Sequence, residues 1–234
     1  MRIFFLENEN PYRTSSGGIM SYLMNLSTFL KTQKIETILC GVGKQQSKKN
    51  EIFSEFKQIL VDDNPSNYKY IFALFRKLKT LKLSRETIIH AQRPDMLIPA
   101  ICLFRKTKFV CSLHGAHDKA VFDKKGFVNG VIYSFLQRIA FKYADLLIAV
   151  DAETKSYYLK KYSFIKDKIQ LVPIAVDTDK FCVMEKKIIR GKYGLLQKDK
   201  IIIFVGRLEK EKNVKFIIDS FTHVQKKTEN VKLL

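Results

Sequence analysis

Short runs of apolar and β-branched residues recur along the chain, separated by longer stretches with helical periodicity. Seven runs have the length and composition of strands: Arg2–Leu6, Thr37–Val42, Thr87–Ala91, Lys108–Leu113, Asp145–Val150, Ile169–Val172 and Lys200–Val205. Between them, apolar residues recur at helical spacing, for example at Ile19, Leu23, Leu26 and Leu30. Strands that alternate with helices predict an α/β fold: a Rossmann-like parallel sheet with helices on both faces. Ligands of such sheets bind beyond the carboxyl ends of the strands.

The distribution of these runs predicts two domains of unequal completeness. Residues 1–177 hold most of the strand runs and form the expected N-terminal domain, on the acceptor side. Residues 178–199 are polar and basic and are expected to connect the domains, with one short helix. Residues 200–234 have room for one strand, one helix and the start of another strand, which is too little to close a core. We therefore expect a two-domain protein truncated early in its second domain.

The net charge of +19 in 234 residues favours anionic partners: nucleotide phosphates, nucleic acid or an acidic membrane surface. The alternative is that the scattered lysines only form solvated faces. Nucleic acid is not expected as a partner, because no reading motif and no aromatic–basic cluster occurs. The four cysteines are widely spaced and predict buried thiols in a reducing compartment, not a disulfide framework or a zinc site. No run approaches the ~18 apolar residues of a spanning helix. We expect a cytoplasmic location, with peripheral contact at the inner face of the membrane left open.

The most specific motif is Val-Gly-Arg-Leu-Glu-Lys-Glu-Lys-Asn-Val at residues 205–214. It follows a strand run and precedes a helical pattern, so Arg207 and Lys212 should flank the start of a helix. Free N–H groups and the helix dipole favour an anion there. Arg offers a fork for two phosphate oxygens, and Lys offers a point charge. The motif predicts a diphosphate site; the alternative is two surface cations in a basic protein.

Gly17 and Gly18 precede the first helical stretch, where they would let a ligand approach the backbone. The alternative is a plain loop with Ser16 as the helix cap. His114 ends an apolar strand and precedes Gly115, at the edge of the sheet where ligands bind. His117 could take the place of His114. His90, inside a strand, is expected to be structural, and His223, inside a helix, is expected to lie on the surface. Asp118 and Asp123 are expected to be ordinary loop residues. No pair of histidines has metal-ligand spacing, so no metal site is expected.

Taken in order, several segments resemble a family 4 retaining glycosyltransferase with the GT-B fold, in which two Rossmann-like domains face each other across a cleft. They are Ser15–Gly18, Ile88–Gln92, Ser112–Gly115, Ala144–Asp151, Val172–Asp177 and Gly206–Val214. Three features depart from the family pattern. Gln92 stands where a second His is common, and Ile174-Ala175 replaces Asn-Gly. The family's E-x7-E motif, two glutamates with seven residues between them, is missing.

The resemblance implies transfer of a hexose from an NDP-sugar to a glycan or lipid-linked acceptor, with retention, in cell-surface polysaccharide biosynthesis. It implies that Gly17, Gly18, Arg207 and Lys212 bind the donor phosphates. It implies that His114 hydrogen-bonds near the donor sugar, without a metal, another cofactor or a protein nucleophile. The alternative is a catalytically inactive remnant, because the missing glutamates would hold the donor sugar and ribose.

Residues 70–83 form a basic amphipathic stretch that could lie on anionic lipid. The favoured alternative is a helix packed on the sheet with a solvated basic rim.

Overall fold

The structure is a computed structural model of the 234 residues, and it describes all of them except 13–16, 45–51, 63, 105, 207 and 209–211. The chain forms two compact units, Met1–Val176 (unit 1) and Asp177–Leu234 (unit 2).

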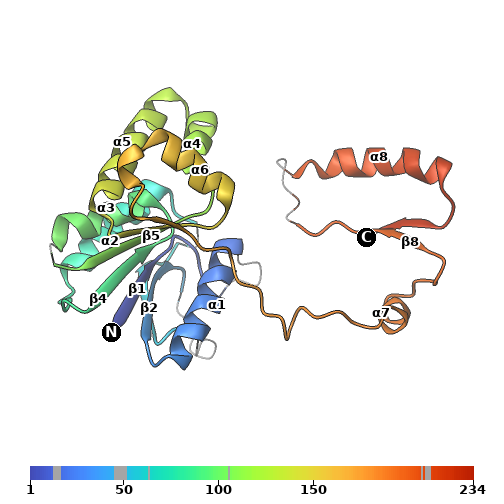
Figure 1. The fold of residues 1–234 in the computed structure, drawn as a ribbon, viewed down its shortest axis with the longest axis horizontal. Coiled ribbons are helices and arrows are strands. Elements are labelled where there is room, and N and C mark those ends of the chain that lie inside the picture. Colours follow the sequence, from blue (N-terminus) through green and yellow to red (C-terminus); the bar gives the residue numbers. More distant parts are fainter. Residues whose placement is uncertain (13–16, 45–51, 63, 105, 207, 209–211) are drawn as a thin grey trace. The chain divides into compact units, whose positions relative to one another are not determined.

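Unit 1 is built on a fully parallel sheet. Its strands are β1 (Arg2–Leu6), β2 (Glu36–Val42), β3 (Glu55–Leu60), β4 (Thr87–Ala91), β5 (Lys108–Leu113), β6 (Leu146–Ala149) and β7 (Ile169–Leu171), in the order β3-β2-β1-β4-β5-β6-β7 (Figure 1). From β1 the chain first builds the sheet outward through β2 and β3. It then returns to the other side of β1 and adds β4 to β7. The order reverses between β1 and β4, which is where open α/β sheets bind their ligands.

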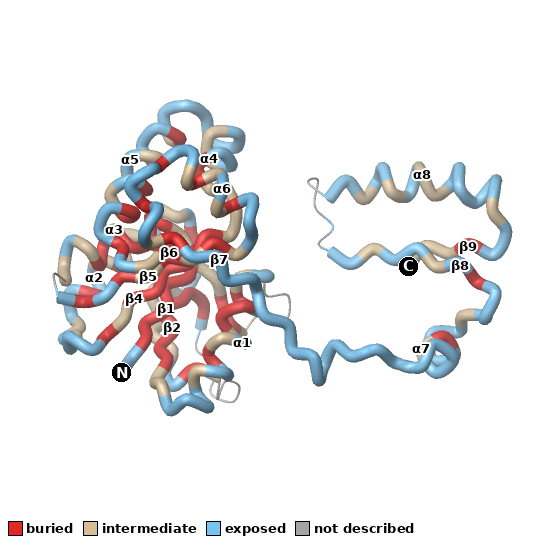
Figure 2. Tube along the Cα trace, in the orientation of Figure 1, coloured by how far each residue is buried: buried red, intermediate tan, exposed pale blue. Residues whose placement is uncertain are grey.

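Helices cover both faces of this sheet (Figure 1). They are α1 (Gly18–Thr32), α2 (Asn67–Lys79), α3 (Pro94–Leu103), α4 (His117–Lys125), α5 (Phe127–Tyr143) and α6 (Ala152–Lys161), followed by the short 3-10 helix η1 (Ser163–Ile165). Because side chains alternate along a strand, β1 contributes residues to two hydrophobic cores, one on each face of the sheet. Its Phe5 packs with Leu23 of α1, whereas Leu6 packs with residues of α2, α3, α5 and α6 on the other face. Figure 2 shows the buried residues concentrated along the strands.

Unit 2 consists of α7 (Lys186–Lys192), β8 (Lys200–Ile202), α8 (Val214–Lys227) and β9 (Val231–Leu233). β8 and β9 pair in parallel, with Lys200 opposite Val231. The buried Arg190 ties α7 to the start of β8, because its guanidinium donates to the carbonyl of Asp199 at 2.9 Å. A β-α-β arrangement of this size leaves apolar side chains uncovered, and Ile203 and Phe216 are exposed.

The structure confirms the predicted α/β class and each predicted strand, with several strands shorter by one to three residues. The prediction omitted β3, an edge strand whose sequence Glu-Phe-Lys-Gln-Ile-Leu mixes charged and apolar residues. Edge strands often carry such charges, because one side of the strand is not covered by a neighbour.

Within residues 70–83, Tyr70, Leu74 and Leu78 of α2 are buried in the core, so the packed alternative is right and this face is not free for lipid. The prediction of buried thiols holds for Cys40 and Cys111. It is wrong for the other two: Cys102 on the outer side of α3 and Cys182 are exposed. Within the described part of the chain, no helix is long and apolar enough to cross a membrane.

Candidate functional site

Polar side chains directly follow three adjacent strands of unit 1. Glu7 follows β1, Gln92 and Arg93 follow β4, and His114 follows β5. Because these strands are parallel neighbours, their carboxyl ends lie along one edge of the sheet. This strand-end cluster therefore occupies the ligand-binding edge, at and beside the point where the strand order reverses.

His114 is held in a defined orientation and is uncharged. Its Nε2 lies 2.9 Å from Oε1 of Gln92, and its half-buried ring packs edge-on against Tyr22 of α1, with the ring centroids 5.3 Å apart. Burial, helped by the nearby His117, lowers the pKa of His114 to about 4. Because an amide oxygen only accepts, Nε2 carries the proton and Nδ1 remains an acceptor. His114 can thus exchange hydrogen bonds with a sugar hydroxyl without carrying charge.

A buried chain of hydroxyl and imidazole groups anchors α1 to the same edge. Tyr22 of α1 lies 3.4 Å from the hydroxyl of Ser112, which lies 2.8 Å from Nε2 of His90. Burial lowers the pKa of His90 to about 3, so this ring is also neutral. His90 lies inside β4, and its contacts fit the structural role expected for it. Through Tyr22, this chain fixes the first turns of α1 beside His114.

Gly17 and Gly18 lie at the start of α1, as predicted. Gly17 is the residue before the helix, and its N–H donates to a carboxylate oxygen of Glu9 at 3.3 Å. A Cβ at Gly17 would come within 2.7 Å of that carboxylate, so a side chain here would force Glu9 to move. Gly18 has open space around it. A phosphate approaching the N–H of Gly17 would have to displace Glu9.

Glu7 is a buried carboxyl group that the sequence interpretation did not single out. Its Oε1 accepts from the N–H of Asn8 at 2.9 Å, and its Oε2 has no hydrogen-bond partner. Burial, helped by the charge of Glu9, raises the pKa of Glu7 from 4.5 to about 8. Glu7 therefore retains its proton at neutral pH.

An ion pair between Arg93 and Asp95 lies next to this carboxyl group, and Arg93 also donates to Oδ1 of Asn67 at 2.9 Å. The Arg93 and Asp95 side chains are both largely buried, so their ion pair lies in surroundings of low polarity. The pair holds the loop after β4 in place. His117 faces the same region: burial and the positive charge of Arg93 lower its pKa to about 4, and its Nε2 has no partner. His117 thus belongs to the strand-end cluster, as His114 does.

The expectation that Asp118 is an ordinary loop residue is wrong. Asp118 lies in the first turn of α4 and is fully buried. It pairs with Lys161 of α6 and accepts from the hydroxyl of Tyr157 at 3.0 Å. This carboxylate therefore joins α4 to α6. Asp123 is exposed on α4.

The predicted phosphate motif lies in unit 2. The strand and the helix expected on either side of it are present: β8 precedes the motif, and α8 begins at its last residue, Val214. Lys212 is exposed and precedes Asn213, which adopts a left-handed conformation immediately before α8. Arg207 lies outside the described residues. Lys212 belongs to unit 2, whereas Gly17, Gly18 and His114 belong to unit 1.

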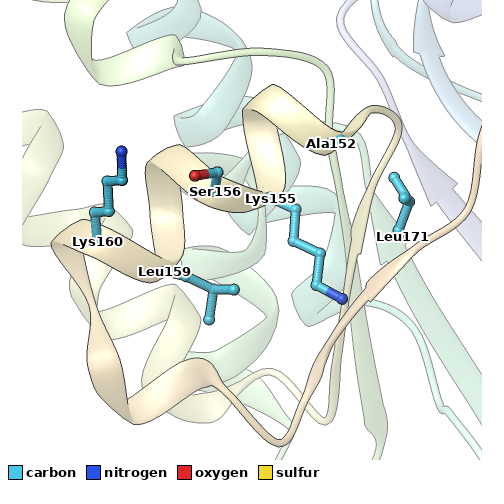
Figure 3. A pocket seen from close by; sticks show the side chains of 6 residues that line it. All are labelled: Ala152, Lys155, Ser156, Leu159, Lys160 and Leu171. Atoms are coloured by element: carbon cyan, nitrogen blue, oxygen red, sulfur yellow. The ribbon is translucent and has the colours of Figure 1, made fainter.

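Two open pockets of unit 1 are lined by none of the predicted site residues. One, of about 400 Å³, lies between α6 and β7. In Figure 3, Lys155 of α6 extends toward Leu171 of β7; the pocket is lined by Ala152, Lys155, Ser156, Leu159, Lys160 and Leu171. A larger one lies near the amino end of β5 and includes Lys108. Among the described residues, no group of three or more His, Cys, Asp or Glu side chains is placed to hold a metal ion.

The sequence interpretation missed Glu7, Arg93 and Asp95, each a few residues beyond a predicted strand. Their position was a usable signal, because polar residues just after apolar strands lie at the ligand-binding edge. Their burial could not be predicted from the sequence, since it depends on helices that are distant in the chain.

The chain is 26% identical over 201 residues to an uncharacterized glycosyltransferase of Methanocaldococcus jannaschii, covering 80% of this chain and 48% of that protein. It is 26% identical over 163 residues to the UDP-Gal:alpha-D-GlcNAc-diphosphoundecaprenol alpha-1,3-galactosyltransferase of Escherichia coli, covering 69% and 42%. It is also 25% identical over 220 residues to a Campylobacter jejuni alpha-1,4-N-acetyl-D-galactosaminyltransferase, covering 91% and 55%. The chain thus spans about half the length of these curated relatives.

Solved structures share the fold at low sequence identity. Sucrose-phosphate synthase from Thermosynechococcus elongatus matches with a TM-score of 0.75 and 12% identity, over 99% of this chain and 61% of that one. WaaG, a glycosyltransferase involved in lipopolysaccharide biosynthesis, matches with a TM-score of 0.68 and 15% identity, over 99% and 62%. These matches support the GT-B fold class.

Two family models cover nearly all of the chain. Glycosyl transferases group 1 matches residues 185–234, in unit 2. Glycosyltransferase Family 4 matches residues 16–180, which include the ends of β4 and β5 with Gln92 and His114. By the larger of these matches, the chain belongs to Glycosyltransferase Family 4.

Proposed function

We propose that the protein transfers a hexose from an NDP-sugar to a glycan or lipid-linked acceptor, with retention of configuration, in the synthesis of a cell-surface polysaccharide. The observation that carries this proposal is the neutral, oriented His114 at the carboxyl end of β5, packed against Tyr22 of α1. Tyr22 is one turn beyond Gly18, so the helix start with its free N–H groups lies near this imidazole. A sugar hydroxyl and a phosphate could therefore be bound side by side.

The lipid-linked acceptor is supported by the relatives. The names of the Escherichia coli and Campylobacter jejuni proteins both specify undecaprenol diphosphate acceptors, and the first also specifies a UDP-sugar donor. We accordingly propose action at the cytoplasmic face of a membrane, with peripheral contact to anionic lipid and no nucleic acid partner.

In the proposed reaction, negative charge grows on the departing nucleoside diphosphate. Arg207 and Lys212 would stabilise that charge as preplaced cations, with no metal required. Gly18 would offer its backbone N–H, and Gly17 would do so once the phosphate displaced the carboxylate of Glu9. His114 would hold a hydroxyl of the donor sugar. The departing phosphate would help to deprotonate the acceptor, so no protein nucleophile is needed.

Calorimetric titration with UDP, GDP and ADP tests donor binding. The Arg207→Ala/Lys212→Ala double variant should lose at least roughly tenfold in affinity, because two charge-assisted hydrogen bonds to phosphate are removed. Unchanged affinity would overturn the phosphate assignment.

A transfer assay tests the activity. The E-x7-E pair does not occur in these 234 residues. We therefore expect the chain by itself to show little or no transfer, which is also what the inactive alternative predicts. Robust turnover of an NDP-sugar by this chain would overturn the inactive alternative and show that transfer does not need the E-x7-E pair.

A further inference from the structure

Four buried polar atoms beyond the ends of β1, β4 and β5 have no hydrogen-bond partner among the described residues. They are Oε2 of Glu7, Oδ1 of Asn8, Nε2 of Gln92 and Nε2 of His117. Glu7 and Asn8 follow β1, Gln92 follows β4, and His117 begins α4, shortly after β5. An unpaired buried polar atom costs free energy, so such atoms are rare in folded proteins. Four of them at one edge of the sheet indicate that something polar binds there. We call Glu7, Asn8, Gln92 and His117 the polar subsite.

The members of the polar subsite lie near one another around the Arg93–Asp95 ion pair. The charges of Arg93 and Asp95 both act on the ionisation of Glu7, and they act on that of His117 as well. His117 in turn acts on the ring of His114. Because such effects fall off with distance, these groups form one patch along the edge. The patch includes the point between β1 and β4 where the strand order reverses.

The polar subsite offers both donors and acceptors of hydrogen bonds. Nε2 of Gln92 donates and Oδ1 of Asn8 accepts, whereas Nε2 of the neutral His117 ring takes either role according to its tautomer. Oε1 of Glu7 accepts from the N–H of Asn8, so the proton that Glu7 retains at neutral pH lies on Oε2 and is available to a ligand. A hydroxyl group also donates and accepts, so the several hydroxyls of a sugar ring match a mixed set of this kind.

The polar subsite is electrically balanced, although the chain as a whole carries a net charge of +19. The positive charge of Arg93 is paired with Asp95, and burial keeps the Glu7 carboxyl and the His117 ring uncharged at neutral pH. A carboxylate or phosphate pressed against the subsite would lose its hydration and find the Arg93 charge already paired. An uncharged sugar loses less hydration and gains hydrogen bonds to the four unpaired atoms. The subsite therefore favours a neutral sugar over an anionic one.

We propose that the polar subsite binds an uncharged sugar ring, and that the Glu7 carboxyl donates a hydrogen bond to one of its hydroxyls. The inference rests on the proposed function only in identifying this sugar as the end of the acceptor, next to the donor sugar held by His114. Glu7 is then a specificity-determining residue, because a sugar without the matching hydroxyl leaves the buried donor unpaired. The binding itself requires neither Arg207 nor Lys212 of unit 2.

The charged groups around Glu7 decide at which pH it can donate. Glu7 is faced by Glu9 of its own loop, by Arg93 and Asp95 beyond β4, and by Tyr70 of α2. Burial and the charge of Glu9 outweigh the opposing charge of Arg93 and raise the pKa of Glu7 to about 8. Below that pH the carboxyl donates, whereas above it the carboxylate only accepts and the hydrogen bond to the sugar is lost. Sugar binding should therefore weaken as the pH rises through about 8.

NMR of the histidine rings reports on the polar subsite directly, because the chain has four histidines and their signals are easily resolved. His114 and His117 lie at the ligand-binding edge, whereas His223 is exposed on α8 in unit 2 and serves as the internal control. The full chain is titrated at about pH 7 with the methyl α-glycosides of glucose, galactose, N-acetylglucosamine and N-acetylgalactosamine, and with the anionic methyl α-glucuronide. We expect at least one uncharged glycoside to shift the signals of His114 and His117 but not that of His223. The glucuronide should bind at least roughly tenfold more weakly.

Variants of Glu7 separate the hydrogen bond from the packing of the side chain. Glu7→Gln keeps a neutral donor of nearly the same shape, so its affinity for the glycoside should stay within roughly threefold of that of the natural protein at about pH 7. Glu7→Leu has no donor and should bind at least roughly tenfold more weakly. Between about pH 7 and about pH 9 the natural protein should lose roughly tenfold in affinity as Glu7 ionises, whereas the Glu7→Gln variant should not. Glu153→Gln, on the exposed side of α6, is the matched control and should bind as the natural protein does.

If no glycoside shifted the signal of His117, ordered water alone would pair the four atoms and the proposal would be wrong. It would also be wrong if the natural protein kept its full affinity at about pH 9, or if a folded Glu7→Leu variant bound as tightly as the natural protein. Circular dichroism shows whether each variant is folded, and if Glu7→Leu is not, the pH comparison with Glu7→Gln decides.

Titration of the same sample with UDP tests the proposed function separately. Glycoside binding without UDP binding would leave this inference standing while the donor assignment failed. UDP binding without glycoside binding would have the opposite meaning.

Discussion

Replacing Glu7 by glutamine should change how the stability of the protein depends on pH. Glu7 is only 4% exposed, and its Oε2 has no hydrogen-bond partner. Burial and the charge of Glu9 raise its pKa from 4.5 to about 8. Below the lower value, both folded and unfolded chains carry the proton, and Glu7 makes no pH-dependent contribution. As the pH rises, the unfolded chain ionises first, so folding is progressively disfavoured until the folded carboxyl also ionises.

The size of the effect follows from the two pKa values. The difference between 4.5 and about 8, at about 1.4 kcal/mol per pH unit, gives a loss of at most about 5 kcal/mol across this range. An amide does not titrate, so the Glu7→Gln variant should avoid this loss. It should be several kcal/mol more stable than the natural protein above the folded pKa and similar to it in mild acid.

Urea unfolding followed by circular dichroism at about pH 5 and about pH 8.5 measures both free energies of unfolding. Glu153→Gln is the matched control, because Glu153 is exposed on α6 and is not part of the buried strand-end cluster. If the natural protein and the Glu7→Gln variant lost stability in parallel between these two pH values, Glu7 would not be a buried neutral carboxyl.

Three further changes have defined outcomes. Gly130→Ala should lower the free energy of unfolding by about 1–2 kcal/mol, because the new Cβ would lie 2.2 Å from the Phe122 ring. Gly191→Ala, with open space around it, should not lower it; equal urea midpoints would refute the clash. Asp118→Asn removes the buried charge that joins α4 to α6 and should cost about 3 kcal/mol in the same assay, and a loss below about 1 kcal/mol would contradict that role. Gln92→Ala removes the hydrogen-bond partner of His114 and lets water reach its ring. The pKa of His114, measured by NMR titration, should therefore rise toward 6.5. An unchanged pKa would show that the Gln92 amide does not hold the His114 ring in its buried position.

Much of the fold was predictable because its signals are local. The strands β1, β4 and β5 match their apolar runs residue for residue, since a buried parallel strand must be apolar on both faces. The weakly patterned β3 could not be found this way. It borders a single neighbour, β2, so its half-exposed residues mix charge with apolarity.

The candidate site was predictable only in part. Residues that follow a strand, such as His114, could be placed at the ligand-binding edge from local order alone. Their partners could not, because the contact between His114 and Gln92 requires β4 and β5 to be neighbours. The raised pKa of Glu7 could not be predicted from the sequence at all, since it depends on how completely the surrounding elements exclude water from the end of β1.

The sequence alone therefore determined the α/β class, the order of the strands along the chain and the position of the Gly206–Val214 motif between a strand and a helix. These follow from side-chain periodicity and glycine placement within a few residues. Only the tertiary structure decided which strands are neighbours, that Asp118 is buried against Lys161, and that α2 buries Leu74 while it exposes Phe72. The physical reason is that burial and charge pairing are set by groups distant in the chain, and the free energy of a charged or apolar group depends on whether those groups have removed its water.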